Sequence, residues 1–421
     1  MSAEQSNIAV NALRLACHCK ANSYSFSAAT PLDSTFTDVR ICQCTDCRLQ
    51  TGNLASWFVR APHKPFNPKY VPDTLKAYQV DTSLTHYFCR TCSSQLFRRE
   101  DPPDGDGEPE FWIFIGCLDL PPDYRFKISH VEGIEEGSDG GLASWLPGVR
   151  YHGKNGVTLK DDDIRGLESS EDSAGSSGNA AGDGETEDDQ LSDNGEDGAG
   201  RLRGECHCSN IELRLSRLAD NNEYKPPLIY SDNTDLVIPY WTPQDQQPPI
   251  DHENPWWIRK AAPNSEHKRF LGGNCTCTSC RTISGTEVQS WIFVPTNCIH
   301  IILPNGESIP WPSRETLING SDRRVNRIIG VYKSSPGDPG VIRGFCKKCG
   351  ANIFWDGLTR RNFIDLSAGL FTINGTKQQE WIEWWTERVS YVEDTKGIAR
   401  EDIGLLVETG IREWRKRSSF V

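Results

Sequence analysis

The stretch Cys42-Gln43-Cys44-Thr45-Asp46-Cys47 decides how this sequence is interpreted, because the same C-x-C-x-x-C pattern returns as Cys275-Thr276-Cys277-Thr278-Ser279-Cys280. Each copy is preceded by a C-x-C pair and followed by a C-x-x-C pair, and the cysteines of these pairs are Cys17, Cys19, Cys89 and Cys92, then Cys206, Cys208, Cys346 and Cys349. Fourteen of the 16 cysteines fall in this repeated order. An internal duplication is the simplest explanation.

The spacing of the outer pairs predicts one closed zinc site in each copy. A C-x-C pair and a C-x-x-C pair together supply four thiolates, which fill the tetrahedron around a zinc ion and leave no open position. Such a site is structural. We expect it to be formed by Cys17, Cys19, Cys89 and Cys92 in the first copy and by Cys206, Cys208, Cys346 and Cys349 in the second.

The middle motif supplies three thiolates, so a zinc ion held there keeps its fourth position for water or substrate, as catalytic zinc does. We therefore expect catalytic zinc at Cys42, Cys44 and Cys47, and again at Cys275, Cys277 and Cys280. This gives two Zn²⁺ ions per domain and four per chain. Two alternatives remain open: all seven cysteines of a copy hold metal for folding alone, or a nearby histidine or Cys117 closes the middle site.

Four other residues stand beside these ligands. Arg48 and Arg281 directly follow the third middle cysteine, and we expect them to hold the carboxylate of a small thiol such as glutathione. An ion pair with a structural role is the alternative. His18 and His207 stand between two expected zinc ligands, a position that should point each imidazole away from the metal.

Length and charge predict two domains joined by a linker. Residues 161–200 carry 14 acidic residues and a single base and have almost no large apolar residues, so we expect a disordered acidic linker. The predicted division is an N-terminal tail at 1–12, a first zinc domain at 13–160, this linker, a second zinc domain at 201–396, and a C-terminal helix and tail at 397–421.

The fold class is expected to be mainly β. The 25 prolines and 36 glycines favour turns and short strands. Strand-like apolar runs occur at residues 54–59 and 288–294, and two Pro-, Asn- and Asp-rich inserts of the second copy, around 220–265 and 305–340, are expected to be surface loops. The clearest helix spans 399–417, and its apolar face consists of Ile403, Leu406, Val407, Ile411 and Trp414.

Composition also argues against several classes of partner. The sequence has no apolar run near the roughly 20 residues that a membrane span needs, and its start lacks the features of a secretory signal. We expect a cytoplasmic protein, with a nuclear location left open, whose thiols stay reduced and bind metal. Outside 161–200 the charges balance at 44 acids and 44 bases, so nucleic acid is not an expected partner. The oligomeric state is left open.

The motifs C-H-C, C-x-C-x-x-C-R-x-x-[ST]-G and F-C-x-x-C occur in this order in both copies and resemble the glutathione-dependent formaldehyde-activating enzyme family, which includes centromere protein V. Residues 116–119 and 138–146 of the first copy also resemble family segments. The resemblance implies two tandem β-tent-like domains, each with a structural zinc at the outer pairs and a catalytic zinc at the middle cysteines.

The resemblance further implies a carbon–sulfur lyase that acts on a small thiol adduct such as S-hydroxymethylglutathione, with glutathione as co-substrate. The small thiol would be the partner of the three-cysteine sites. A non-catalytic, zinc-stabilised binding protein is the alternative, and a metal-buffering or redox protein is a third. The second copy departs more from the family pattern, because it has Ala368-Gly369-Leu370 where the first has Gly116-Cys117-Leu118.

Overall fold

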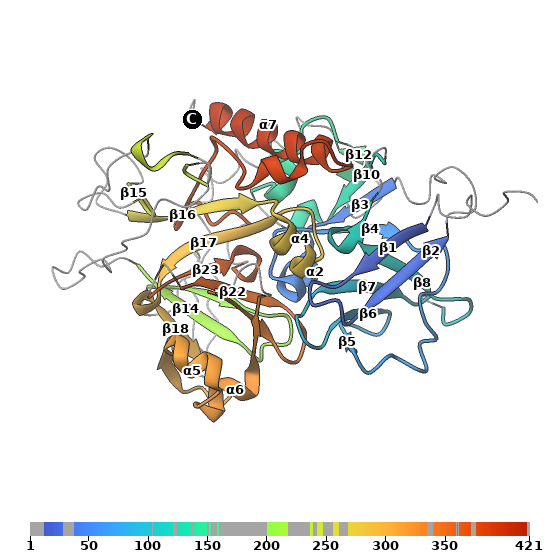
Figure 1. Ribbon diagram of the computed structural model, residues 1–421, viewed down its shortest axis with the longest axis horizontal. Helices are drawn as coiled ribbons and strands as arrows, with labels where there is room; N and C mark the ends of the chain where they lie inside the picture. The colour runs from blue at the N-terminus through green and yellow to red at the C-terminus, as the bar shows by residue number, and fades with distance from the viewer. Residues whose placement is uncertain are drawn as a thin grey trace, which may run out of the picture.

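The computed structural model describes residues 12–27, 38–102, 104–120, 124–136, 139–149, 151–152, 158–159, 200–217, 236–238, 242–246, 256–260, 268–334, 340–358, 360, 362–371 and 376–418. Nearly all of the predicted tail and linker, and most of the insert at 220–265, lie outside these residues. The described chain is mainly β with few helices, as predicted. Figure 1 shows its two halves side by side, with helices α2 and α4 between them.

The first half contains a nine-stranded sheet and a three-stranded sheet. The larger sheet runs in the order β12 (Thr158–Leu159), β11 (Tyr151–His152), β10 (Lys127–Glu132), β3 (Asp38–Cys42), β4 (Ser56–Arg60), β8 (Glu110–Phe114), β7 (Gln95–Glu100), β6 (Leu84–Cys89), β5 (Leu75–Gln79). The smaller sheet runs β2 (Ser23–Ser27), β1 (Ala12–Ala16), β9 (Leu118–Asp119). The helical segments are α2 (Thr45–Thr51), η1 (Ile115–Cys117), η2 (Ile134–Glu136) and η3 (Gly141–Trp145).

The second half contains an eight-stranded sheet and a four-stranded sheet. The larger sheet runs β15 (Ile258–Lys260), β16 (Lys268–Cys275), β17 (Gln289–Pro295), β23 (Phe363–Ser367), β22 (Asn352–Gly357), β21 (Val341–Cys346), β20 (Ile329–Lys333), with β24 (Ile382–Trp384) paired to β16. The smaller sheet runs β13 (Arg201–Glu205), β14 (Glu212–Ser216), β18 (Ile299–Ile302), β19 (Ser308–Pro310). The helical segments are η5 (Gln244–Gln246), α4 (Thr278–Ser284), η6 (Thr296–Cys298), α5 (Arg314–Asn319), α6 (Arg323–Ile328), η7 (Ala368–Leu370), η8 (Val392–Thr395) and α7 (Glu401–Ser418).

The strand order of the two large sheets corresponds element by element. The path β3-β4-β8-β7-β6-β5 in the first half matches β16-β17-β23-β22-β21-β20 in the second. In both halves a parallel strand, β10 or β24, joins the first strand of this path, and a short helix, α2 or α4, follows that strand. The three-cysteine motif therefore begins at the end of the equivalent strand in each half.

The apolar strands after the two short helices, β4 and β17, align differently by sequence and by structure. The sequence aligns their Ser-Trp dipeptides, but the strand pairing is offset from this alignment by one residue. Ser56 lies opposite Cys42, whereas Gln289 lies opposite Cys275. Because side chains alternate between the faces of a strand, this offset turns the two Ser-Trp dipeptides to opposite faces. Trp57 is fully buried in the main core, whereas Trp291 packs against the three cysteines of the second middle motif.

The two halves share a close interface, which the sequence did not indicate. The Gly116 N–H donates to the Gly285 carbonyl at 2.8 Å, and the Gly369 N–H donates to the Gly52 carbonyl at 3.1 Å. A Cβ atom at Gly52, whose φ is 77°, would lie 2.2 Å from the Asn352 carbonyl oxygen. Only glycine permits this approach of the two backbones. One core of buried apolar residues includes members from both halves.

Helix α7 packs the C-terminal segment against the first half. It buries Ile403, Val407, Ile411 and Trp414, as its predicted apolar face requires, and Leu406 is partly buried. The Trp414 ring meets the Trp145 ring of η3 edge-on, with centroids 5.8 Å apart. Figure 1 shows α7 along one edge of the molecule. No helix of the described chain is long and apolar enough to cross a membrane.

The prediction of a surface loop around 305–340 was wrong. This insert contains β19, α5, α6 and β20. Ser313 and Asp322 cap the two helices by accepting N–H groups of their first turns, and Leu317, Val325 and Ile328 are buried. Asp322, one of the residues that suggested a loop, is therefore a helix cap.

Candidate metal centres

The outer cysteine pairs of the first half form a cluster of four sulfur atoms. Cys17 and Cys19 follow β1, Cys89 ends β6, and Cys92 lies in the turn after it. All four sulfur atoms lie within 4.8 Å of one another, and Cys19 Sγ is 3.5 Å from both Cys17 Sγ and Cys89 Sγ. A tetrahedron with Zn–S bonds of roughly 2.3 Å has edges of about 3.8 Å. The four thiols therefore fit a closed metal site.

The second half repeats this cluster with Cys206, Cys208, Cys346 and Cys349. Cys208 Sγ lies 3.6 Å from Cys206 Sγ and from Cys346 Sγ. The residue after the last cysteine has a positive φ in both halves, 58° at Ser93 and 83° at Gly350. The serine at this position therefore leaves the geometry of the first cluster unchanged.

The middle cysteines form a different kind of cluster, with three sulfur atoms within 4.8 Å of one another and no fourth cysteine, histidine or carboxylate among the described residues. Cys42 ends β3, and Cys44 caps α2 by accepting the Cys47 N–H at 3.4 Å. Cys42 and Cys47 are buried, but Cys44 is partly exposed. The cluster is therefore accessible from one side.

The second middle cluster has the same arrangement. Cys277 caps α4 by accepting the Cys280 N–H at 3.4 Å, and it is partly exposed, whereas Cys275 and Cys280 are buried. The aromatic residues around it are Trp291, Trp355 and Tyr391.

The electrostatics of the first middle cluster fit a bound cation. Hydrogen bonds from Cys42 and then Cys47 lower the pKa of Cys44 to about 4, whereas the same contacts with Cys42 and Cys44 raise the pKa of the fully buried Cys47 thiol. Three thiols this close therefore ionise together only if positive charge balances them. A divalent metal ion supplies that charge and deprotonates its thiol ligands.

One buried arginine contacts each middle cluster, and the sequence interpretation missed both. Arg98 Nη1 donates to Cys47 Sγ at 3.3 Å, and Arg343 Nη1 and Nη2 donate to Cys280 Sγ at 3.5 and 3.6 Å. A zinc ion with three thiolates carries a net charge of −1, which one guanidinium balances. In the second half the available signal was Arg343, the one charged residue of the strand Val341–Cys346. In the first half Arg98 stands beside Arg99 and Glu100, so the local sequence gave no such signal.

The two arginines come from different strands. In the first half Arg98 of β7 lies opposite His86 of β6. In the second half the arginine takes the position equivalent to His86, because Arg343 of β21 lies opposite Trp355 of β22. The arginine therefore lies on neighbouring, non-equivalent strands in the two halves, but in both halves its guanidinium contacts the third cysteine of the middle motif.

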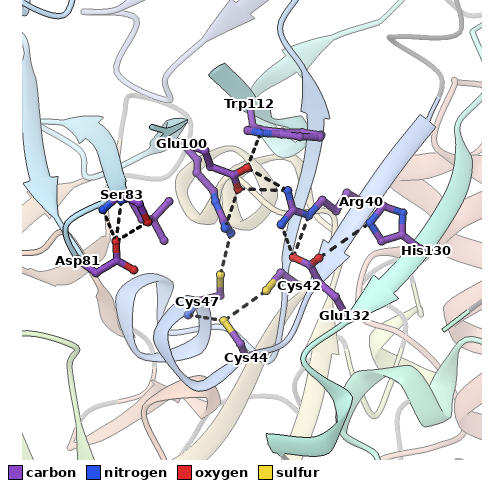
Figure 2. A network of polar contacts seen from close by, with 12 residues as sticks. Arg40, Cys42, Cys44, Cys47, Asp81, Ser83, Glu100, Trp112, His130 and Glu132 are labelled. Carbon is purple, nitrogen blue, oxygen red and sulfur yellow. Dashed lines mark hydrogen bonds and ion pairs between the residues drawn. The ribbon is translucent and has the colours of Figure 1, made fainter. Parts of the chain in front are cut away.

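An ion network extends from the first cluster toward the surface (Figure 2). Arg98 Nη2 lies 2.7 Å from Glu100 Oε1, which lies 3.1 Å from Arg40 Nη1. Arg40 Nη2 lies 2.7 Å from Glu132 Oε1, and His130 Nε2 lies 4.0 Å from the other oxygen of Glu132. The network fixes Arg98 against Cys47.

The two arginines predicted to hold a thiol carboxylate lie in different surroundings. Arg281 Nη1 donates to the Gly116 carbonyl at 2.7 Å and so contributes to the interface between the halves. Arg48 is 1% exposed, and its Nη2 donates to Thr45 Oγ1 at 3.1 Å. Its Nε and Nη1 have no hydrogen-bond partner within the part of the chain that the structure describes. Burial lowers the pKa of Arg48.

Neither Cys117 nor the C-H-C histidines complete a cluster. Cys117 Sγ contacts the carbonyl oxygens of Gln95 and Thr282, at 3.3 and 3.0 Å. Both ring nitrogens of His18 and of His207 contact other side chains, as their predicted orientation away from the metal requires.

Comparison with known proteins relates the first half to one family. The family model described as glutathione-dependent formaldehyde-activating enzyme matches residues 12–130. This match includes all seven cysteines of the first half that form the two clusters. The match supports a relation of this part of the chain to that family, whose activity is glutathione-related. No curated protein matches, and no solved structure does.

Proposed function

We propose that this protein is a zinc-dependent carbon–sulfur lyase-like enzyme that acts on a small thiol adduct such as S-hydroxymethylglutathione. The proposed chain consists of zinc domains at 13–160 and 201–396 joined by the acidic linker, each with one closed and one open zinc site, in a cytoplasmic protein. The family match of residues 12–130 and the four cysteine clusters support this assignment.

The observation that carries the proposal is the difference between the two kinds of cluster. A four-thiolate site has no place for a substrate, whereas a three-thiolate site with a partly exposed sulfur has one. Zinc, when bound there, lowers the pKa of a thiol that takes the fourth position. A small thiol is then presented as a thiolate beside Cys44.

The proposed reaction balances without an oxidant or reductant. In the synthetic direction the thiolate sulfur of glutathione attacks the carbon of formaldehyde, a C–S bond forms, and the C=O electron pair moves to oxygen, which takes up a proton. In the lyase direction the hydroxyl loses its proton as the C–S bond breaks. Arg98 contributes by balancing the charge of Cys47 and keeping the site nearly neutral.

Of the two predicted carboxylate partners, Arg48 fits the role better. Its Nε and Nη1 are buried and unpaired among the described residues, so the role requires a local opening of the site, after which a substrate carboxylate would satisfy them. Arg281 already uses its guanidinium at the interface. The first half is therefore the proposed main active site.

The direct test is NMR exchange spectroscopy with ¹³C-formaldehyde and glutathione. Zinc-loaded wild-type protein should accelerate exchange between free formaldehyde and S-hydroxymethylglutathione, and the double variant Cys44→Ser/Cys277→Ser should not. Cys298→Ala is the matched control, because Cys298 is a buried cysteine outside every cluster. Wild-type exchange no faster than the uncatalysed rate would instead favour a zinc-stabilised binding protein.

A further inference from the structure

The histidine of the second closed site contacts the first half. His207 Nε2 lies 3.3 Å from Asp46 Oδ1, and its Nδ1 lies 2.7 Å from the Tyr78 hydroxyl. An ionised carboxylate only accepts hydrogen bonds, so Nε2–H donates to Asp46, and in the neutral ring Nδ1 accepts from Tyr78. The His207 backbone N–H also donates to the Leu49 carbonyl of α2, at 3.1 Å.

The histidine ring of the first closed site makes the equivalent contacts in the opposite direction, whereas its backbone N–H donates to Ser94 Oγ of its own half, at 3.0 Å. His18 Nε2 lies 3.2 Å from Ser279 Oγ, and its Nδ1 lies 2.9 Å from the Tyr332 hydroxyl. Tyr78 and Tyr332 occupy equivalent strands, β5 and β20. The two histidines therefore cross the interface in opposite directions and reach equivalent positions.

The residue that each histidine reaches lies within a three-cysteine segment, which consists of an extended stretch and the first turn of α2 or α4 and is called the open loop below. Asp46 stands between Cys44 and Cys47, and Ser279 stands between Cys277 and Cys280. These loops carry the partly exposed cysteine that borders the open position. A hydrogen bond to the loop from outside its own half restricts how the exposed sulfur moves.

Further contacts hold the same two parts together. Gln50 of α2 donates to the Cys349 carbonyl at 3.1 Å, and Gln95 donates to the Gly350 carbonyl at 2.8 Å. The turn of the second closed site is thereby bound to α2, the helix whose first turn contains Asp46 and Cys47. The first open loop and the second closed site thus form one connected structural unit.

We propose that each open site is positioned in trans by the closed site of the other half: His207 is a positioning residue for the loop Cys44–Cys47, and His18 is one for the loop Cys277–Cys280. A single half therefore lacks part of the support of its own open site, which gives a physical reason for both halves to stay in one chain. The inference needs only that the loops hold metal, and it stands whether or not the lyase reaction is correct.

The test compares the matched variants His207→Ala and His18→Ala in the full-length, zinc-loaded protein by hydrogen–deuterium exchange with peptide resolution. A lost hydrogen bond of ordinary strength changes an opening equilibrium by about two- to tenfold. We expect His207→Ala to accelerate exchange by this factor in the peptide 42–52 and to leave 275–285 unchanged. His18→Ala should have the reverse effect.

A second readout separates positioning from general packing. With cobalt(II) in place of zinc and Cys277→Ser removing the second open site, His207→Ala should shift the cobalt absorption of the first open site, and His207→Gln, which keeps a donor for Asp46, should restore it. If His207→Ala fails to fold, Tyr78→Phe removes the hydroxyl that meets Nδ1 without changing the closed-site loop, and it should give a smaller change in the same direction.

Three results would overturn the inference. One is acceleration of exchange within the half that carries the substitution and none in the other half. Another is equal acceleration of both loops by either variant, which would indicate general loosening of the interface. The third is an unchanged cobalt spectrum in His207→Ala.

Discussion

Replacing Cys92 by serine should destabilise the protein more than replacing Cys44 by serine. Both changes remove one thiolate from a metal cluster, but the clusters close chain segments of different length. The closed cluster joins Cys19 to Cys89, 70 residues apart, whereas the open cluster joins Cys42 to Cys47, five residues apart. For substitutions that release the metal ion, the loop-closure term, three-halves RT ln n with n the number of residues between the joined cysteines, then differs by about 2 kcal/mol.

The measurement is urea denaturation of the zinc-loaded wild type, Cys92→Ser and Cys44→Ser, with Cys298→Ala as the control. Cys92→Ser should lose about 2 kcal/mol more of its free energy of unfolding than Cys44→Ser, because metal binding is coupled to folding. Cys44→Ser should lose thiol-adduct activity in the first half while its fold is kept. An equal loss of free energy of unfolding in both variants would refute the distinction between a closed site, which joins distant segments of the chain, and an open site, which does not.

Four further outcomes follow from the same structure. Elemental analysis should give four zinc ions per chain, whereas two or fewer would contradict the two-site arrangement. Glu287→Gln should lower the free energy of unfolding by about 3–5 kcal/mol, because it leaves buried Arg400 without its ion-pair partner, and a loss below 1 kcal/mol in urea titration would show that the pair is dispensable. Burial, and then the charge of Arg98, lower the pKa of His86, so below pH about 6.5 the unfolded chain takes up a proton that the native protein does not. The free energy of unfolding of the wild type should therefore fall as the pH falls below about 6.5. In parallel urea titrations His86→Phe should reduce the slope of this fall by up to about 1.4 kcal/mol per pH unit. Cleavage at a protease site engineered into residues 161–199 should leave two fragments that co-elute in gel filtration because of the interface, and separate elution would contradict its stability.

The cysteine clusters could be predicted from sequence because their geometry is mostly local. A C-x-C or C-x-x-C pair places two sulfur atoms within reach of one ion whatever the surrounding fold. The repeated order then suggested which pairs combine, and the structure brings together the same sulfur atoms. The buried face of the C-terminal helix could also be predicted, because the spacing of its apolar residues follows the helical period. These residues are Ile403, Val407, Ile411 and Trp414.

The charge partners of the open clusters could not be predicted in the same way. Arg98 and Arg343 reach the third cysteine through strand pairing, which joins residues about 50 to 60 positions apart in the chain. Their positions differ by one strand between the halves, so aligning the two copies does not reveal them. Arg48 and Arg281 attracted attention because they adjoin the ligands in sequence, which says little about what a guanidinium contacts.

The interface between the halves was missed for a related reason. Gly52 and Gly285 end α2 and α4 in the structure, and that role alone explains a glycine with positive φ. Their second role, close approach to the other half, depends on a surface that the local sequence does not contain. The acidic segment between the halves also suggested independent domains, although a linker sequence carries no information on whether the domains it joins touch.

The central claim is that the three-cysteine sites hold zinc with a position open to a small thiol, and the most direct test is selenium-edge X-ray absorption of the zinc-loaded protein with a selenol analogue of glutathione. Selenium bound to zinc gives a scattering vector that no protein sulfur can produce. We predict a selenium–zinc vector in wild-type protein that is lost in Cys44→Ser/Cys277→Ser. A selenium spectrum without a zinc neighbour, together with four sulfur ligands on every zinc ion, would contradict the account.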